Sequence, residues 1–207
     1  INSVLDFKTS EYNTKKNEKI RSVFFKEAES HKKNNILEKL PINCFRLNFI
    51  NKAFPEAKYI VIKRNPLEVA ASIEEKIGKG NWYGVNDNKL RLLIEYAKSN
   101  NVETKDFLKT DFNKGLLEWR LSNIAISKFF NDSKKDFFSI NYSNLTLNPK
   151  EILTEAFNFL EIKYNEEALI NCCKLVYKNL RNKENIKNNI QSNQKEFLIS
   201  EGFIQEK

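Results

Sequence analysis

The chain has 207 residues, a formal net charge of +8 at pH 7, and a hydrophobic content of 41%. This length and apolar content predict a single globular domain over residues 1–207 and exclude a disordered segment. No apolar run approaches the roughly 20 residues that a helix needs to span a bilayer, and charged residues stand where a secretory signal has its apolar core. We therefore expect a soluble, cytoplasmic protein without a membrane span.

The positive charge favours partners that carry several negative charges, such as a phosphorylated cofactor, a nucleic acid or an acidic glycan. Lysines that only solvate polar helix faces explain the same charge equally well. The three cysteines, Cys44, Cys172 and Cys173, are an odd number that favours a reducing compartment over a disulfide scaffold. With a single histidine, His31, interpreted as a surface residue, and no Cys-x-x-Cys pair, we expect no metal site.

Helical and strand patterns alternate along the chain. Helices are expected over residues 15–33, 44–54, 66–76, 87–99, 110–131, 149–160 and 165–178, and strands over 59–62 and 136–142. This order predicts an α/β fold with a parallel sheet flanked by helices. Because residues 59–62 form an unbroken apolar run, we expect that strand to be covered on both faces.

Two of the predicted helices begin with a recognisable cap. Asn43 is expected to cap the helix over 44–54. Asn65 is expected to cap the helix over 66–76, with Pro66 at its first position and Glu68 three residues after the cap.

Arg64 stands between the first predicted strand and the Asn65 cap. In open α/β sheets, ligands bind outside the carboxyl ends of the strands. A guanidinium group at such a place can hold a phosphate through two hydrogen bonds. The alternative is an arginine that forms a salt bridge with a carboxylate at the rim of the sheet.

Ser72 follows Asn65 by seven residues, almost two helical turns, so it faces the same side as the start of its helix. Its hydroxyl would then be able to reach a phosphate that Arg64 holds. The alternative is a serine that donates to the backbone carbonyl four residues earlier.

These residues resemble the sulfotransferases that use 3′-phosphoadenosine-5′-phosphosulfate (PAPS). Residues 54–58 match the family's Phe-Pro-x-Ala-Lys, and Ser72 matches its serine eight residues after the arginine. Residues 64–66 resemble its usual Arg-Asp-Pro, with Asn65 in place of the aspartate. Residues 142–149 resemble its Tyr-Glu-Asp-Leu-x-x-x-Pro, and residues 157–162 its Phe-x-Phe-Leu-Gly-Ile. The resemblance implies a P-loop-NTPase-like sulfotransferase fold.

The resemblance also implies roles for single residues. Arg64 and Ser72 would hold the 3′-phosphate of PAPS, and Tyr142 would lie on the nucleoside side. Lys39, which lies 25 residues before Arg64 and directly before a Leu-Pro pair, would contact the bridging oxygen of the leaving 5′-phosphate. An ammonium group there would stabilise the charge that develops as the S–O bond breaks. A solvated turn lysine and an ordinary core tyrosine are the alternatives for Lys39 and Tyr142.

Family members open with a strand and a loop that binds the 5′-phosphosulfate, and no such loop occurs in residues 1–207. We therefore expect an N-terminally incomplete sulfotransferase domain, with these parts upstream. Arg181 and Lys183 loosely resemble the family's late basic segment. The general base is not identified, and Glu27 and Glu29 are candidates.

The sequence is thus interpreted as a sulfotransferase that moves a sulfuryl group from PAPS to an acceptor hydroxyl or amine without a metal. The acceptor, whether a glycan, a peptide, a lipid or a small alcohol, is not predicted. One alternative is a non-catalytic module that binds a nucleotide or polyanion. A P-loop kinase is disfavoured because the Gly-x-x-x-x-Gly-Lys-Ser/Thr pattern does not occur. An RNA-binding protein has no supporting motif, so no nucleic-acid partner is expected.

Overall fold

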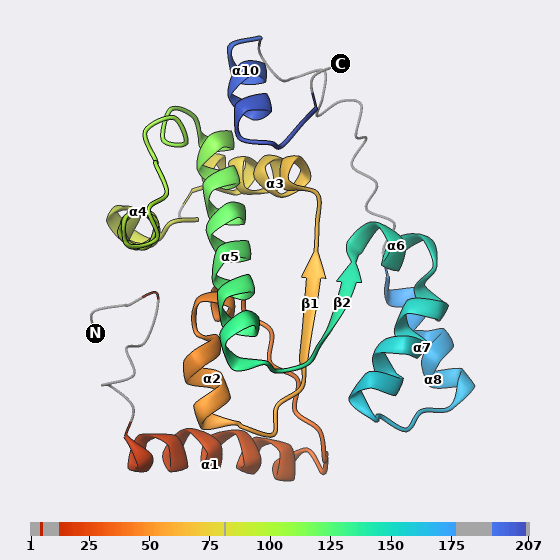
Figure 1. The fold of residues 1–207 in the computed structure, drawn as a ribbon. Helices are drawn as coiled ribbons and strands as arrows, with labels where there is room; N and C mark the ends of the chain where they lie inside the picture. Colours follow the sequence, from red (N-terminus) through yellow and green to blue (C-terminus); the bar gives the residue numbers. More distant parts are fainter. Residues whose placement is uncertain (1–4, 6–12, 81, 177–191, 206–207) are drawn as a thin grey trace. The chain divides into compact units, whose positions relative to one another are not determined.

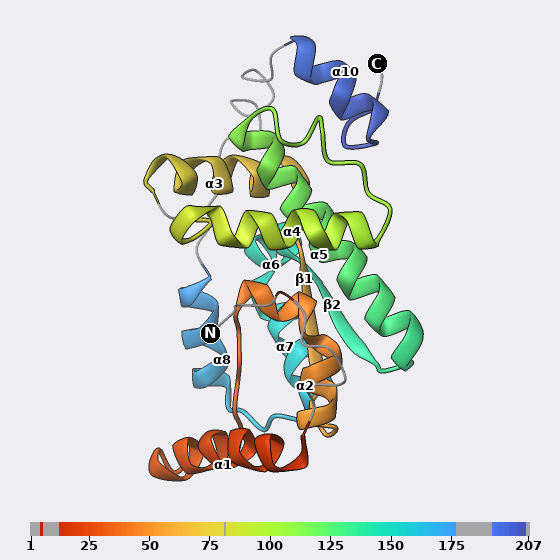
Figure 2. The same cartoon turned by 90° about the vertical axis from the view of Figure 1, so that its left-hand side faces the viewer.

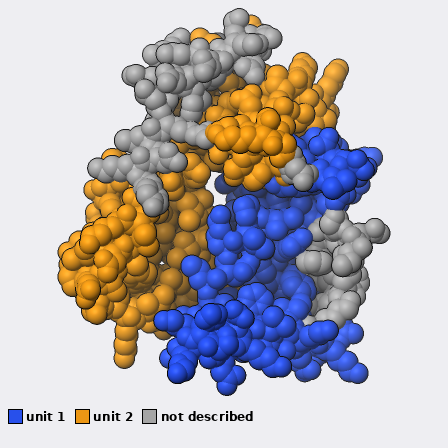
Figure 3. Space-filling model, turned by 180° about the vertical axis from the view of Figure 1, so that it is seen from behind, with its two compact units in different colours: residues 1–57, 83–102, 121–135 blue, residues 58–82, 103–120, 136–207 orange. Residues whose placement is uncertain are grey.

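The computed structural model describes residues 5, 13–80, 82–176 and 192–205 (Figure 1). The chain forms two compact units (Figure 3). Unit 1 contains residues 1–57, 83–102 and 121–135, and unit 2 contains residues 58–82, 103–120 and 136–207. Each unit combines three separate stretches, so the units do not follow one another along the sequence. The single domain remains a prediction.

Unit 1 is helical in its described residues. Its elements are α1 (Thr14–Ser30), the 3₁₀ turn η2 (Pro41–Phe45), α2 (Leu47–Ala53), the 3₁₀ turn η3 (Val85–Asp87) and α4 (Asn88–Ser99). The side chain of Asn13 caps α1 by accepting a hydrogen bond from the Lys15 amide. The rings of Phe45 and Tyr96 pack edge to face with centroids 5.1 Å apart, so α4 and η2 share one core.

The predicted helix cap at Asn43 is wrong. Asn43 lies inside η2, and its side-chain amide donates to Glu38 instead of accepting from a helix. Pro41 begins this turn, because its fixed φ and missing N–H suit the first position of a helical turn. The α-helix α2 therefore begins only at Leu47, with Arg46 at its N-cap.

Unit 2 holds the sheet. Its elements are β1 (Tyr59–Lys63), α3 (Pro66–Gly78), β2 (Phe137–Asn141), α6 (Tyr142–Leu147), α7 (Pro149–Leu160), α8 (Glu166–Leu175) and α10 (Ser192–Ser200). The long helix α5 (Asp111–Ser133) begins in unit 2, and its later residues belong to unit 1. The two strands are parallel, and their arrowheads point to the same end of the sheet (Figure 1). The predicted α/β class with a parallel sheet and flanking helices is confirmed.

The prediction that the first strand is covered on both faces is wrong for part of β1. Tyr59 and Val61 are buried, whereas Ile62 is 50% exposed. Its partner Ile140 on β2 is buried. In the described residues the sheet has two strands, so each strand has a neighbour on one side only and its apolar residues are unevenly covered.

Helices α7 and α8 lie side by side in unit 2 (Figure 2), and α7 confirms the helix predicted over 149–160. Phe159 of α7 stacks on Phe138 of β2 with ring centroids 5.8 Å apart. The Lys58 ammonium, just before β1, donates to the Phe159 carbonyl and lies 2.8 Å from the Glu161 carboxylate. These contacts attach α7 to the sheet. No helix in the described ranges is both long and apolar enough to cross a bilayer.

Helices α3 and α5 approach each other closely at Gly115. A Cβ atom added at Gly115 would lie 2.8 Å from the Ala70 Cα, 3.0 Å from the Ala70 carbonyl oxygen and 3.2 Å from the Ile73 Cβ. Ala70 and the neighbouring Leu116 are fully buried. The two backbones therefore touch where both side chains are small.

Gly115→Ala should lower the free energy of unfolding. Overpacking a close contact costs about 1–3 kcal/mol, which exceeds the ~1 kcal/mol that alanine gains over glycine in a helix. Gly78→Ala is the matched control. Gly78 is the last residue of α3, and nothing lies within 4 Å of a Cβ added there. Urea denaturation of both variants measures the difference. A Gly115 variant as stable as the Gly78 variant would show that the helices separate without cost.

Candidate functional site at the carboxyl ends of two parallel strands

Two predicted site residues lie at one edge of the sheet, just after the ends of the two strands. Lys63, the last residue of β1, lies opposite Asn141, the last residue of β2. Arg64 follows the first of these strand ends and Tyr142 follows the second. The Arg64 Cζ atom lies 4.3 Å from the centroid of the Tyr142 ring. The structure therefore brings Arg64 and Tyr142 together through a cation–π contact.

The predicted cap at Asn65 is confirmed. Its side-chain oxygen accepts hydrogen bonds from the amides of Leu67, at 2.9 Å, and Glu68, at 3.4 Å. Pro66 occupies the first helical position and has no N–H to offer. The first-turn amides of α3 are thus already used or missing, which leaves side chains to supply hydrogen bonds to a ligand at this edge.

A second asparagine cap makes β2 shorter than predicted. The side-chain oxygen of Asn141 accepts from the amides of Ser143, at 2.9 Å, and Asn144, at 3.3 Å. Tyr142 therefore begins α6 instead of ending the strand. The local reason is the preference of asparagine for helix caps, which ends the extended run one residue early.

A cavity of about 380 Å³ opens between the two strand ends. It is lined by Lys63, Arg64, Asn65, Asn141, Ser143 and Asn144. Two of these side chains are cationic, four are neutral and polar, and none is a carboxylate. Such a lining attracts an anion and offers it several hydrogen-bond donors.

Arg64 lines this cavity and has a side-chain donor without an acceptor. Its Nε atom is buried and has no hydrogen-bond acceptor among the described residues. No carboxylate of the described part of unit 2 forms a salt bridge with Arg64, so the alternative of a rim ion pair has no partner there. A buried donor without an acceptor is costly.

Trp119 fixes the backbone beneath this guanidinium. Its indole Nε1 donates to the carbonyl oxygen of Arg64 at 3.1 Å. No sequence pattern predicts this contact, because the two residues are 55 positions apart. The residue comes from α5, whose backbone contact with α3 at Gly115 lies four residues earlier.

Ser72 lies on α3 and is half-buried. Within the described part of the chain its hydroxyl forms no hydrogen bond, so the alternative of a serine that donates to the carbonyl four residues earlier is not what the structure contains. Its place almost two turns after the cap is as predicted. Its role in phosphate binding stays a prediction.

The other predicted residues belong to unit 1 or lie outside the described residues. Lys39 belongs to unit 1, where it is exposed in the irregular segment before η2. Glu27 contacts His31 on the exposed end of α1, with the carboxylate oxygen and ring nitrogen 3.1 Å apart. Arg181 and Lys183 lie outside the described residues.

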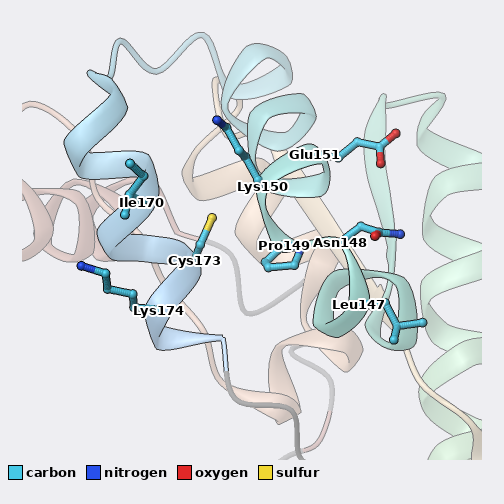
Figure 4. A pocket seen from close by; sticks show the side chains of 8 residues that line it. All are labelled: Leu147, Asn148, Pro149, Lys150, Glu151, Ile170, Cys173 and Lys174. Carbon is cyan, nitrogen blue, oxygen red and sulfur yellow. The ribbon is translucent and has the colours of Figure 1, made fainter.

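A second hollow, of about 550 Å³, lies between α8 and the junction of α6 and α7 (Figure 4). It is lined by Leu147, Asn148, Pro149, Lys150, Glu151, Ile170, Cys173 and Lys174. It contains none of the predicted site residues. The described residues also contain no group of three His, Cys, Asp or Glu side chains that could hold a metal ion.

Comparison with known proteins identifies the family. The model of the Sulfotransferase family matches residues 7–166. This range contains Lys39, Arg64, Ser72 and Tyr142, as well as both strands whose ends border the cavity. No curated protein and no solved structure matches the chain. Because the family match covers most of the sequence and includes the whole sheet edge, this protein belongs to the sulfotransferase family.

Proposed function

We propose that this protein transfers a sulfuryl group from PAPS to an acceptor hydroxyl or amine, and that the cavity at the strand ends binds the 3′-phosphate of the donor. Family membership supports sulfuryl transfer. The observation that supports the 3′-phosphate site is the buried Arg64 Nε without an acceptor beside a cavity that has cationic but no acidic side chains.

Each residue at the edge has a proposed task. The Arg64 guanidinium grips the 3′-phosphate, and the Tyr142 ring under it restricts its orientation. Lys63 adds a second positive charge to the same cavity. Ser72 donates its hydroxyl to the phosphate. The start of α3 adds the positive end of a helix dipole, although its first amides are already bonded to Asn65.

The proposed reaction is an in-line displacement at sulfur. The acceptor oxygen or nitrogen forms a new bond to sulfur while the bond between sulfur and the bridging oxygen of the 5′-phosphate breaks. The acceptor proton leaves to a base, and adenosine 3′,5′-bisphosphate is the product nucleotide. Lys39 is proposed to stabilise the charge on the departing phosphate. Positioning and charge stabilisation supply the catalysis, as in phosphoryl transfer.

Calorimetry with the product nucleotide tests the proposed site. Adenosine 3′,5′-bisphosphate should bind at least ~10-fold more tightly than adenosine 5′-monophosphate, because one charge-assisted hydrogen bond contributes about 1.5–3 kcal/mol. Adenosine 2′,5′-bisphosphate is the matched control, since it carries the same charge with the phosphate moved by one carbon. Equal binding of the two bisphosphates would show attraction to charge alone and would rule out a 3′-phosphate site.

A sulfuryl-transfer assay distinguishes an enzyme from a non-catalytic nucleotide-binding module. Mixtures of glycans, peptides and small alcohols incubated with isotope-labelled PAPS should yield a labelled, sulfated product that mass spectrometry detects. Bisphosphate binding without transfer to any acceptor class would favour the binding module.

A further inference from the structure

We infer that Trp119 is a positioning residue for Arg64 and that the C-terminal segment, residues 197–203, holds Trp119 in place. The identity of the ligand that Arg64 meets rests on the proposed function. The positioning itself rests on contacts within unit 2 that do not depend on the ligand.

The backbone of Arg64 is held by one side-chain donor. The first carbonyl that α3 uses is that of Asn65, which accepts from the Val69 amide at 3.1 Å. The carbonyl of Arg64 therefore lies outside the hydrogen-bond ladder of the helix. The Trp119 indole, which has a single N–H, donates it to this carbonyl.

The guanidinium is then restricted on a second side. Its Cζ atom lies over the Tyr142 ring, and its buried Nε has no acceptor among the described residues. An arginine side chain loses much rotamer freedom when it is ordered. Fixing the backbone through Trp119 and the guanidinium face through Tyr142 removes part of that freedom before a ligand binds, which is the purpose of a positioning residue.

An aromatic cluster holds the indole. The Trp119 ring packs edge to face against Phe203, with centroids 5.8 Å apart. The ring centroids of Phe203 and Phe107 are 6.4 Å apart, and those of Phe107 and Phe197 are 5.0 Å apart. Edge-to-face pairs of this kind contribute beyond the area that they bury.

A charged contact strengthens the same attachment. Arg120, next to Trp119, forms an ion pair with Glu201, and its guanidinium lies 5.7 Å from the centroid of the Phe107 ring. Leu198 of α10 is fully buried. Figures 1 and 2 both show α10 beside the first turns of α5. Apolar and charged contacts therefore attach the C-terminal segment to the residues that flank the indole.

Trp119→Phe should weaken the binding of adenosine 3′,5′-bisphosphate about 3- to 10-fold, as expected for the loss of one hydrogen bond. A phenylalanine keeps an aromatic ring against Phe203, lacks the N–H and is smaller than the indole; the control variant below makes the same change in size. Phe203→Leu should weaken binding in the same direction, because the indole loses its edge-to-face support. Trp82→Phe is the matched control, since that indole donates to Glu118 and not to Arg64; its affinity should equal that of the parent.

A double-mutant cycle shows whether Trp119 acts through Arg64. In an Arg64→Ala background, Trp119→Phe should cause no further loss of affinity, because the guanidinium that it positions is gone. An equal loss in both backgrounds would show that the indole supports the fold in general, and would overturn the inference.

A second measurement does not need a nucleotide. In ¹H–¹⁵N spectra of the free protein, the Arg64 Nε–H resonance should shift in Trp119→Phe and in Phe203→Leu, and stay in place in Trp82→Phe. If the parent binds no bisphosphate, the proposed function fails while this shift still tests the positioning. An unchanged Arg64 resonance in Trp119→Phe would refute the positioning even if the bisphosphate binds.

Discussion

Lys39→Ala is expected to lower the turnover of sulfuryl transfer by about 10²–10³-fold while changing the affinity for adenosine 3′,5′-bisphosphate only a few fold. The reason is that the ammonium acts on charge that develops as the sulfuryl group departs, so its contribution belongs to the transition state. Lys39 is exposed and lies two residues before η2, which leaves the ammonium accessible. Single-turnover kinetics with PAPS and an established acceptor, together with calorimetry of the product nucleotide, measure both quantities.

Two further variants make this prediction specific. Lys39→Arg should restore little turnover, because the planar guanidinium group of arginine places its hydrogen-bond donors differently from the compact ammonium group of lysine. Lys33→Ala is the matched control, since it removes another exposed lysine from unit 1 at a place for which no role is predicted. If the Lys39 variants turn over like the parent, Lys39 is an ordinary turn residue and another group meets the leaving oxygen.

Arg64→Ala is expected to weaken the binding of adenosine 3′,5′-bisphosphate by about 2–4 kcal/mol, or roughly 30- to 1,000-fold. The change removes the buried donor that has no acceptor and the cation that covers the Tyr142 ring. It should leave adenosine 5′-monophosphate binding nearly unchanged, because that nucleotide has no 3′-phosphate. Calorimetry with both nucleotides separates the two effects.

Arg91→Ala is the matched control for this loss of charge. Arg91 is exposed on α4, so both substitutions remove one positive charge from a chain of net charge +8. Arg64→Lys keeps the charge and should still lose most of the affinity, since an ammonium cannot make the two-pronged contact. An Arg64→Ala protein that binds as tightly as Arg91→Ala would place the 3′-phosphate elsewhere.

Features that depend only on neighbouring residues can be predicted from the sequence alone. The Asn65 cap and Pro66 at the first position of α3 were predicted because a cap needs only the residues that follow it. The place of Arg64 at a strand end followed in the same way from the apolar run before it. Parallel pairing then placed Arg64 and Tyr142 at one edge, because both follow a strand and parallel strands end on the same side.

Two predicted boundaries are wrong at places where neighbouring residues favour different starts for a helix. Asn43 and Pro41 both favour the start of a helical turn, and the structure begins that turn at Pro41. The second strand was predicted to end at Tyr142, but Asn141 ends β2 and caps α6, so Tyr142 begins that helix. In both places the competing residues are so close together that composition alone does not rank them.

Contacts between distant segments depend on how the elements pack in three dimensions. The Trp119 indole donates to the Arg64 carbonyl, and Gly115 lies against the backbone of Ala70. Ile62 is half-exposed, although its apolar strand was predicted to be buried. Each outcome depends on how helices and strands far apart in sequence approach one another. Amino-acid periodicity reports which face of an element is apolar, but it contains no information on which residue of another element that face will meet.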